Sequence, residues 1–351
     1  MRILLTGVSG FAGSALLPRL LEEGHRVQAL ARDRARVESA LRPIPGVSPE
    51  DIEIVIGDTL TGTGVLGAMR GVEVAYYLIH SMESAPGGNR DEPFPVREQT
   101  SAETFSEAAR AAGVRRIVYL GGLLPRERDT TSAAAEGAVV RQRHVRAEAD
   151  RAGQRTSPRA QISAHLSSRH AVERILLGGV PDSVALRASI VIGARSRSFR
   201  FLVRLVERMP VLTLPAWRRF RTQPIDERDI VEMLLACARE AHAGGRALDV
   251  GGPDVLTYGA MMERIAELMM LARPSVGLGV TATPIAARLA AIVAGEHPEL
   301  VLPLMEGLDG DLLPAGDNDA AGILGVDLHS FDSAVEHALY EWEKVERLAA
   351  R

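Results

Sequence analysis

Three glycines spaced three residues apart follow the first apolar run of the chain and constrain its fold most strongly. The run Arg2–Thr6 is typical of a buried strand, and the segment TGVSGFAG places Gly7, Gly10 and Gly13 between this strand and a helix predicted over Phe11–Glu23. In such a turn the first glycine permits the tight bend, the second lets backbone amides approach a pyrophosphate, and the third allows close helix–strand packing. Because the N-terminus of a helix favours an anion, the motif predicts a dinucleotide phosphate site.

The rest of the N-terminal half alternates short apolar runs with helical patterns. A long helix is predicted over Glu98–Ala112 and ends at Gly113. Strand, helix, strand in this rhythm indicates βαβ units on a parallel sheet, so we expect a Rossmann-type, doubly wound α/β fold. Five further strands are predicted, over Arg26–Ala31, Glu53–Ile56, Val72–Ile79, Arg116–Leu120 and Val184–Ile190.

Two regions break this rhythm and suggest the domain organisation. Residues 123–161 carry no strand signal and are rich in arginine, which favours a solvated surface helix or loop over a substrate lid. After Ile192 the pattern is mainly helical, with a strand near Ala247–Val250 and a last helix around Ser330–Arg347. We therefore expect an NAD(P)-binding domain over 1–192. A smaller substrate lobe over 193–351 should cover the carboxyl edge of the sheet and send segments back to it.

Composition excludes several classes of protein. The net charge of -4 and the pI near 6.2 argue against a nucleic-acid binder that works by neutralising phosphates. The single cysteine, Cys237, excludes an internal disulfide and a multi-cysteine metal site, and suits a reducing cytoplasm. No signal peptide or spanning segment is evident, so we expect a soluble cytoplasmic protein without a membrane partner. Lys344 is the only lysine among 41 basic residues, which excludes a Tyr-x-x-x-Lys catalytic pair.

The end of the second predicted strand bears on the choice of cofactor. The sequence there is ALARDRAR, in which Arg32 comes first, Asp33 follows, and Arg34 and Arg36 lie nearby. An acidic residue at this place would bind the ribose 2′-hydroxyl of NAD, whereas arginine accommodates a 2′-phosphate. Asp33 complicates the choice, but Arg32 follows the strand directly and favours NADP(H) over NAD(H).

These motifs resemble the short-chain dehydrogenase/reductase superfamily in its atypical and extended branches, which include NAD(P)H-binding, NmrA-like and sugar-epimerase-like proteins. TGVSGFAG matches the pattern TGxxGxxG, the segment 57–60 resembles the Gly-Asp element after the third strand, and 75–82 resembles the end of the fourth strand. The segments 116–122 and 186–193 are similar to the fifth and sixth strands. Motif and resemblance together imply cofactor contacts from Gly7, Ser9, Gly10, Phe11, Ala12, Gly13, Arg32, Asp58, Thr59, Leu78, Ile79, His80, Leu120, Gly121, Gly122, Arg169, Ser189 and Ile190.

The sequence departs from the superfamily at the catalytic positions. The superfamily usually places Ser or Thr after the fifth strand, where this chain has Gly121, Gly122 and Leu123. On the next helix, His165 and Arg169 have the spacing of the usual tyrosine and lysine. Arg169 cannot release a proton, so a cofactor contact suits it better than acid catalysis. His165 can exchange a proton near neutral pH, and is interpreted either as a general acid or as a hydrogen-bonded pocket residue.

The resemblance leaves three classes of function open. The first is an NADP-dependent oxidoreductase acting on a small carbonyl, enone or similar metabolite; the second is a redox-neutral epimerase, dehydratase or cyclase; the third is a non-catalytic NADP-sensing or assembly protein. If the chain is an enzyme, we expect His165 and His80 as catalytic candidates and a substrate bordered by His80, Met82, Leu123 and His165. We expect no metal site, and a homodimer remains open.

Overall fold

The central feature of the fold is a seven-stranded parallel sheet with strand order β11-β6-β5-β4-β1-β2-β3. The structure is a computed structural model that describes residues 1–79, 93–123, 164–278 and 310–348. The order reverses between β1 and β4, which creates the switch point beside which α/β sheets bind their ligands. The doubly wound fold expected from the sequence is confirmed. The strands are β1 (Arg2–Thr6), β2 (Arg26–Ala31), β3 (Glu53–Ile56), β4 (Val74–Tyr77), β5 (Arg116–Gly122), β6 (Val184–Ala188) and β11 (Arg246–Val250).

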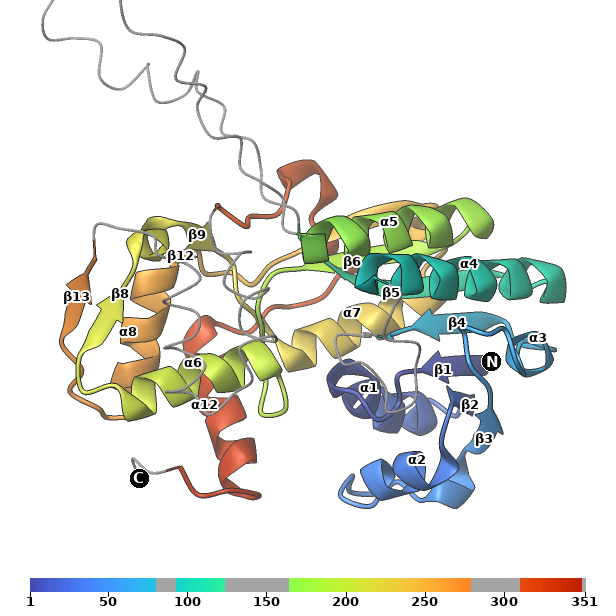
Figure 1. Ribbon diagram of the computed structural model, residues 1–351, viewed down its shortest axis with the longest axis horizontal. Helices are drawn as coiled ribbons and strands as arrows, with labels where there is room; N and C mark the ends of the chain where they lie inside the picture. The colour runs from blue at the N-terminus through green and yellow to red at the C-terminus, as the bar shows by residue number, and fades with distance from the viewer. Residues whose placement is uncertain (80–92, 124–163, 279–309, 349–351) are drawn as a thin grey trace, which may run out of the picture.

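Helices cover both faces of this sheet because its strands are apolar on both sides (Figure 1). Along β1, Ile3 and Leu5 pack into the core on one face, whereas Leu4 packs into the core on the other. The first face is covered by α1 (Phe11–Glu22), α2 (Arg34–Leu41), α7 (Glu227–Arg239) and α11 (Ala320–Leu324). The second face is covered by α3 (Val65–Ala68), α4 (Phe94–Ala112) and α5 (Ala164–Gly179).

A smaller lobe with its own core lies on the side toward which the strands point, where Figure 1 places α6, α8 and α12. Phe199, Trp217, Tyr258 and Trp342 are buried in this core. The helices of the lobe are α6 (Arg197–Arg208), α8 (Tyr258–Leu268) and α12 (Phe331–Glu343). Short strands pair as β7 (Val191–Ile192) with β10 (Ile225–Asp226), β8 (Leu212–Leu214) with β13 (Ser275–Gly277), and β9 (Arg221–Thr222) with β12 (Leu256–Thr257). The 3₁₀ helices are η1 (Pro49–Asp51), η2 (Ala216–Arg219), η3 (Ala241–Ala243) and η4 (Gly316–Asn318).

Several elements differ in their bounds from the sequence-based expectation. Strand β4 stops at Tyr77, because the N–H of Leu78 donates to the hydroxyl of Thr6, 3.0 Å away, instead of continuing the ladder. Helix α4 begins at Phe94, since proline is compatible with the first turn of a helix. Strand β5 continues to Gly122 and β6 ends at Ala188. The strand predicted near Ala247–Val250 is β11, which pairs with β6 as the edge strand of the main sheet. The expectation for residues 123–161 falls almost wholly outside the described residues.

An ion pair between buried Arg116 and partly exposed Asp182 ties β5 to the loop before β6 at the amino edge of the sheet. The Arg116 side chain is 0% exposed; its Nη2 lies 2.7 Å from Asp182 Oδ2, and its Nη1 donates to the Glu240 carbonyl at 2.8 Å. Asp182→Ala would leave the guanidinium buried without its counter-ion, so we expect the free energy of unfolding to fall by about 3 kcal/mol. Urea unfolding followed by circular dichroism measures this change.

Glu53→Ala is the matched control for that prediction. It breaks the pair between Arg2 Nη2 and Glu53 Oε2, which lie 3.0 Å apart and belong to two exposed side chains. Solvent-exposed pairs contribute about 1 kcal/mol or less. Equal losses in the two variants would show that burial of Arg116 does not set the strength of its pair.

Candidate functional site: a dinucleotide cradle at the carboxyl edge of the sheet

The glycine turn after β1 has a geometry that larger residues cannot adopt. Gly7 has a φ of 68°, and a Cβ added there would lie 2.4 Å from the carbonyl oxygen of Leu78. A Cβ on Gly13 would lie 2.3 Å from the carbonyl oxygen of Gly7. Both distances are far below van der Waals contact, so β1, the turn and the first turn of α1 are packed backbone to backbone.

The N-terminus of α1 fits an anion. Gly10 is the N-cap of the helix, is exposed, and provides no side chain to accept hydrogen bonds from the first N–H groups. A Cβ on Gly10 would meet only the Gly7 carbonyl oxygen, at 3.0 Å, within the described residues. Ser9, Phe11 and Ala12 are half-buried beside it. Unpaired N–H groups and the helix dipole both favour negative charge. The glycine turn and the N-terminus of α1, which together form a cradle over residues 7–13, are therefore suited to the pyrophosphate predicted from the sequence.

The residues after β2 now have separate roles. Asp33 is the N-cap of α2, and its Oδ1 accepts a hydrogen bond from the Arg36 N–H at 3.2 Å. Arg34 donates to the Ile54 carbonyl at 2.8 Å. Arg32 is exposed, and in the described parts of the chain no hydrogen bond or ion pair engages its guanidinium. Arg32 is therefore a cation at this strand end that a bound ligand could use.

The turn after β3 lies next to the end of β2 and is fixed by Asp58. Its Oδ1 accepts a hydrogen bond from the Leu60 N–H at 2.9 Å, and its carbonyl accepts one from the Gly62 N–H at 2.8 Å. Thr59 is buried. The predicted contact Asp58 thus lies at the carboxyl edge in a constrained turn, with its second carboxylate oxygen in no hydrogen bond to another described residue.

Arg169 anchors α5 to the carboxyl end of β5. Its Nη2 donates to the Leu120 carbonyl at 3.1 Å, and its own carbonyl accepts a hydrogen bond from the Tyr119 hydroxyl at 3.3 Å. A Cβ on Gly122 would lie 3.6 Å from Arg169 Nε, so the small residue keeps the guanidinium close to the strand. Arg169 and the paired glycines therefore lie together where the sequence expects the cofactor.

The structure describes some of the remaining predicted site residues and not others. The Ser189 hydroxyl donates to the Gln223 carbonyl, and the Ile190 carbonyl accepts from the Ile225 N–H at 3.0 Å. Leu78 and Leu123 are buried and Ile79 is half-buried, all at the ends of β4 and β5. The backbone of His165 lies in the first turn of α5, one helical turn before Arg169. The His165 side chain, His80 and Met82 lie outside the described structure.

Two charged residues that the sequence did not single out also border the glycine turn. Arg195, in the loop after β7, donates from Nη1 to the Ser14 hydroxyl on α1 at 2.8 Å. Glu227, the first residue of α7, lies beside Phe11, and burial raises the pKa of its carboxyl to about 7. Both are about 180 residues or more from the glycine motif in sequence, so only the packing of α7 and the lobe on α1 brings them there.

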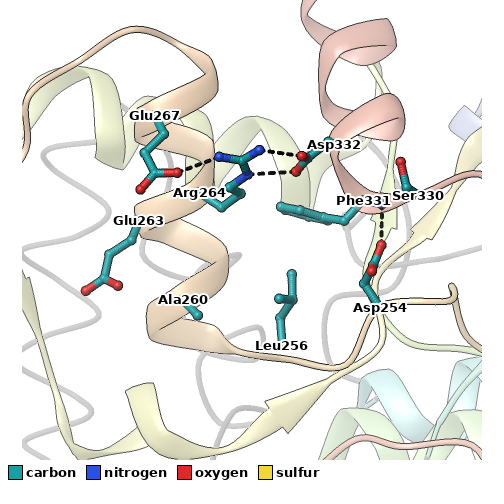
Figure 2. Close-up of a pocket in the computed structure, with 9 residues that line it drawn as sticks. All are labelled: Asp254, Leu256, Ala260, Glu263, Arg264, Glu267, Ser330, Phe331 and Asp332. Atoms are coloured by element: carbon teal, nitrogen blue, oxygen red, sulfur yellow. Dashed lines mark hydrogen bonds and ion pairs between the residues drawn. The ribbon is translucent and has the colours of Figure 1, made fainter.

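A separate cavity of about 360 Å³ lies in the C-terminal lobe between α8, β12 and the start of α12 (Figure 2). Its charged groups bond to one another: Arg264 Nε donates to Asp332 Oδ1 at 2.8 Å and Nη1 to Glu267 at 2.6 Å, while Asp254 accepts the Phe331 N–H at 2.7 Å. The glycine turn and the end of β5 contribute no residue to it. Its lining consists of Asp254, Leu256, Ala260, Glu263, Arg264, Glu267, Ser330, Phe331 and Asp332.

Comparison with known proteins shows what the chain is similar to. Residues 7–154 match the family described as NAD(P)H-binding. The chain is 30% identical over 122 residues to the 3-beta-hydroxysteroid dehydrogenase of Mycolicibacterium neoaurum, which is 34% of this chain and 31% of that protein. It is 24% identical over 267 residues to the ceramide reductase of Caulobacter vibrioides, which is 76% of this chain and 70% of that protein. The matched part of this chain thus spans about a third of the length of the dehydrogenase.

Solved structures give the same fold. The UDP-glucose 4-epimerase of Thermotoga maritima, solved with UDP-glucose, is 13% identical with a TM-score of 0.67, and 98% of this chain and 99% of that one are covered. MoeE5 in complex with UDP-glucose and NAD is 18% identical with a TM-score of 0.64 and the same coverage. The resemblance to the atypical short-chain dehydrogenase/reductase and epimerase-like group is confirmed.

Two kinds of feature are absent from the residues that the structure describes. In 1–79, 93–123, 164–278 and 310–348, no helix has both the length and the apolar character needed to cross a membrane. Over the same ranges, no cluster of three or more His, Cys, Asp or Glu side chains is arranged to hold a metal ion.

Proposed function

We propose that the protein is an NADP(H)-dependent oxidoreductase that acts on the carbonyl group of a small metabolite. The observation that carries the proposal is the glycine cradle at the N-terminus of α1, with the unpaired Arg32 at the neighbouring strand end. Arg32 favours the 2′-phosphate of NADP(H), because Asp33 uses a carboxylate oxygen to cap α2. Curated relatives named as reductases, among them a ceramide reductase and a 2-alkyl-3-oxoalkanoate reductase, support carbonyl chemistry.

The residues at the end of β5 would orient the reacting groups. The chemistry that a nicotinamide held there would supply is a hydride, with its electron pair, for the carbonyl carbon; the carbonyl π electrons would move to the oxygen, and a proton from a side chain or water would complete the alcohol. Arg169, held against the Leu120 carbonyl, suits a contact to the ribose or a phosphate. The proton must come from another group. We assign it to His165, which starts the same helix one turn earlier.

A panel of carbonyl compounds with deuterated NADPH tests the proposal. The panel should include a 3-keto steroid, a 2-alkyl-3-oxoalkanoate and a nucleotide sugar, because relatives carry names of these classes. Stereospecific transfer of one deuterium into a product alcohol is the expected result. A redox-neutral epimerase would instead change its substrate with no net consumption of NADPH. Tight NADPH binding without turnover on any compound would favour a sensing or assembly protein.

Arg32→Glu tests the choice between the two nicotinamide dinucleotides. The change replaces a cation with an anion opposite the 2′-phosphate, so we expect NADPH affinity to fall by about 10- to 100-fold and NADH affinity to change little. Isothermal titration calorimetry with both cofactors measures this ratio. Arg26→Glu makes the same charge change at the exposed opposite end of β2 and should leave both affinities unaltered. A parallel loss in both variants would contradict a local role for Arg32.

A further inference from the structure

We propose that Arg195 and Glu227 form a second wall of the dinucleotide phosphate site, in which Arg195 supplies a cationic contact and Glu227 takes up a proton when the dinucleotide binds. The inference rests on the proposed function, because it presupposes a pyrophosphate at the N-terminus of α1. It adds two residues from the other half of the chain to that site. It also predicts that binding depends on pH.

Arg195 lies where a cation needs an anionic partner. Its Nη1 donates to the Ser14 hydroxyl at 2.8 Å, which places the guanidinium against the first turn of α1. The N-terminus of a helix carries partial positive charge, so a second positive group beside it is unfavourable unless an anion lies between them. Arg195 is exposed, and within the described residues only Ser14 accepts a hydrogen bond from it, although a guanidinium has five N–H donors. A phosphate beside the glycine turn would satisfy both the helix and the arginine.

Glu227 lies near the Phe11 side chain, at the first residue of α1. A Cβ added to Gly193 would lie 2.3 Å from Glu227 Oε2 and 2.9 Å from a ring carbon of Phe11. The glycine therefore leaves room for the carboxylate between the loop after β7 and the first residue of α1. A dinucleotide bound at the N-terminus of α1 would bring negative charge into the neighbourhood of this carboxyl group. An ionised Glu227 would repel the bound phosphates, whereas a protonated one would not.

The surroundings of Glu227 make its proton available near neutral pH. Burial raises the pKa of its carboxyl to about 7, the negative charges of Asp226 and Glu341 raise it as well, and Arg195 opposes them. Asp226 is itself paired with Arg228. The charged or titratable groups on the surrounding elements are Asp226 of β10, Arg228 of α7, Arg195 of the loop after β7, and His337 and Glu341 of α12.

The sign of the pH dependence follows from this arrangement. Below about pH 6 Glu227 is already protonated in the free protein, so affinity should not change with pH on its account. Above about pH 7 the free protein carries an ionised Glu227, and the anionic ligand must draw a proton onto it. Affinity should therefore fall as pH rises through and above 7, by up to about tenfold for each pH unit.

Calorimetry with NADPH at about pH 6 and about pH 8.5, in buffers of different ionisation enthalpy, tests the proposal. The wild-type protein should bind NADPH about tenfold more weakly at the higher pH and take up part of a proton per dinucleotide. Glu227→Gln should lose that extra dependence and that proton uptake. Titration of the ligand's own 2′-phosphate is common to both proteins and cancels in the comparison. Glu107→Gln, at an exposed site on α4, is the control and should behave like the wild type.

Arg195→Ala tests the cationic half of the wall. We expect it to weaken NADPH binding by about tenfold at either pH, whereas Arg246→Ala, which removes an exposed arginine at the amino edge of the sheet, should not. An unchanged pH dependence and proton uptake in Glu227→Gln, or unchanged affinity in Arg195→Ala, would overturn the proposed wall. If the wild-type protein bound neither NADPH nor NADH, the proposed function itself would fail, and the inference with it.

Discussion

Replacing Gly10 with valine is expected to lower the affinity for NADPH by at least about 100-fold while the fold persists. Gly10 has an ordinary φ of -81° and is exposed at the mouth of the cradle. A Cβ there meets only the Gly7 carbonyl oxygen among the described atoms, at 3.0 Å, so the turn must shift slightly to accept the side chain. The valine methyl groups would, however, occupy the space in which the first N–H groups of α1 would contact the pyrophosphate. Loss of two or more charge-assisted hydrogen bonds accounts for the expected magnitude.

Calorimetry and thermal unfolding measured together separate binding from stability in this variant. Gly67→Val is the matched control, because a Cβ on this helical glycine of α3 meets nothing within 4 Å among the described residues, and α3 lies on the other face of the sheet. Gly13→Val should fail for a different reason, since its Cβ would overlap the Gly7 carbonyl and destabilise the turn itself. Unchanged NADPH affinity in Gly10→Val would remove the pyrophosphate from the N-terminus of α1.

The glycine turn was predictable because everything it needs is local. The strand, the turn and the helix follow one another within residues 2–22, and their spacing alone specifies a backbone bend ahead of a helix N-terminus. The same holds for β2 and β3, whose bounds agree with the prediction because uninterrupted β-branched and aliphatic runs end at turn residues. Asp33 was left as a complication. Its position directly before a helix is a capping signal that the sequence contains and that the structure makes explicit.

The remaining parts of the candidate site depend on contacts between distant segments. Arg195 meets Ser14 across 181 residues, and Arg116 meets the Glu240 carbonyl across 124. Neither contact leaves a periodic or compositional trace, because each depends on the order of the strands and on the docking of α7 against α1. The same reason applies to β11: its apolar run predicted a strand, but only the sheet order places it beside β6. Sequence patterns specify elements, whereas long-range packing decides which of their side chains meet.

Substitution of His165 by phenylalanine is expected to lower turnover by about 100-fold or more while NADPH affinity stays unchanged. Phenylalanine keeps a planar ring but cannot exchange a proton. His165 precedes Arg169 by one helical turn, and Arg169 is bonded to the end of β5, so the first turn of α5 passes beside the expected position of the nicotinamide. General acid catalysis contributes about 10²- to 10⁴-fold, which sets the lower limit of the effect. Steady-state rates with the carbonyl substrate found in the deuteride panel measure it.

A neighbouring histidine on the same helix supplies the control that makes this result specific. His170 Nδ1 lies 3.4 Å from Glu173 Oε1, and Glu173 is paired in turn with Arg187 on β6, so His170 belongs to a structural network. His170→Phe should therefore change stability more than turnover. If His165→Phe retains the parental rate, the proton comes from water, from Ser163 or from the substrate itself. The oxidoreductase proposal would survive that result, because hydride transfer requires the cradle and the charge of Arg169 but not a particular acid. A loss of NADPH binding in His165→Phe would instead identify His165 as a cofactor contact, and the missing tyrosine of the superfamily would then have no functional substitute on α5.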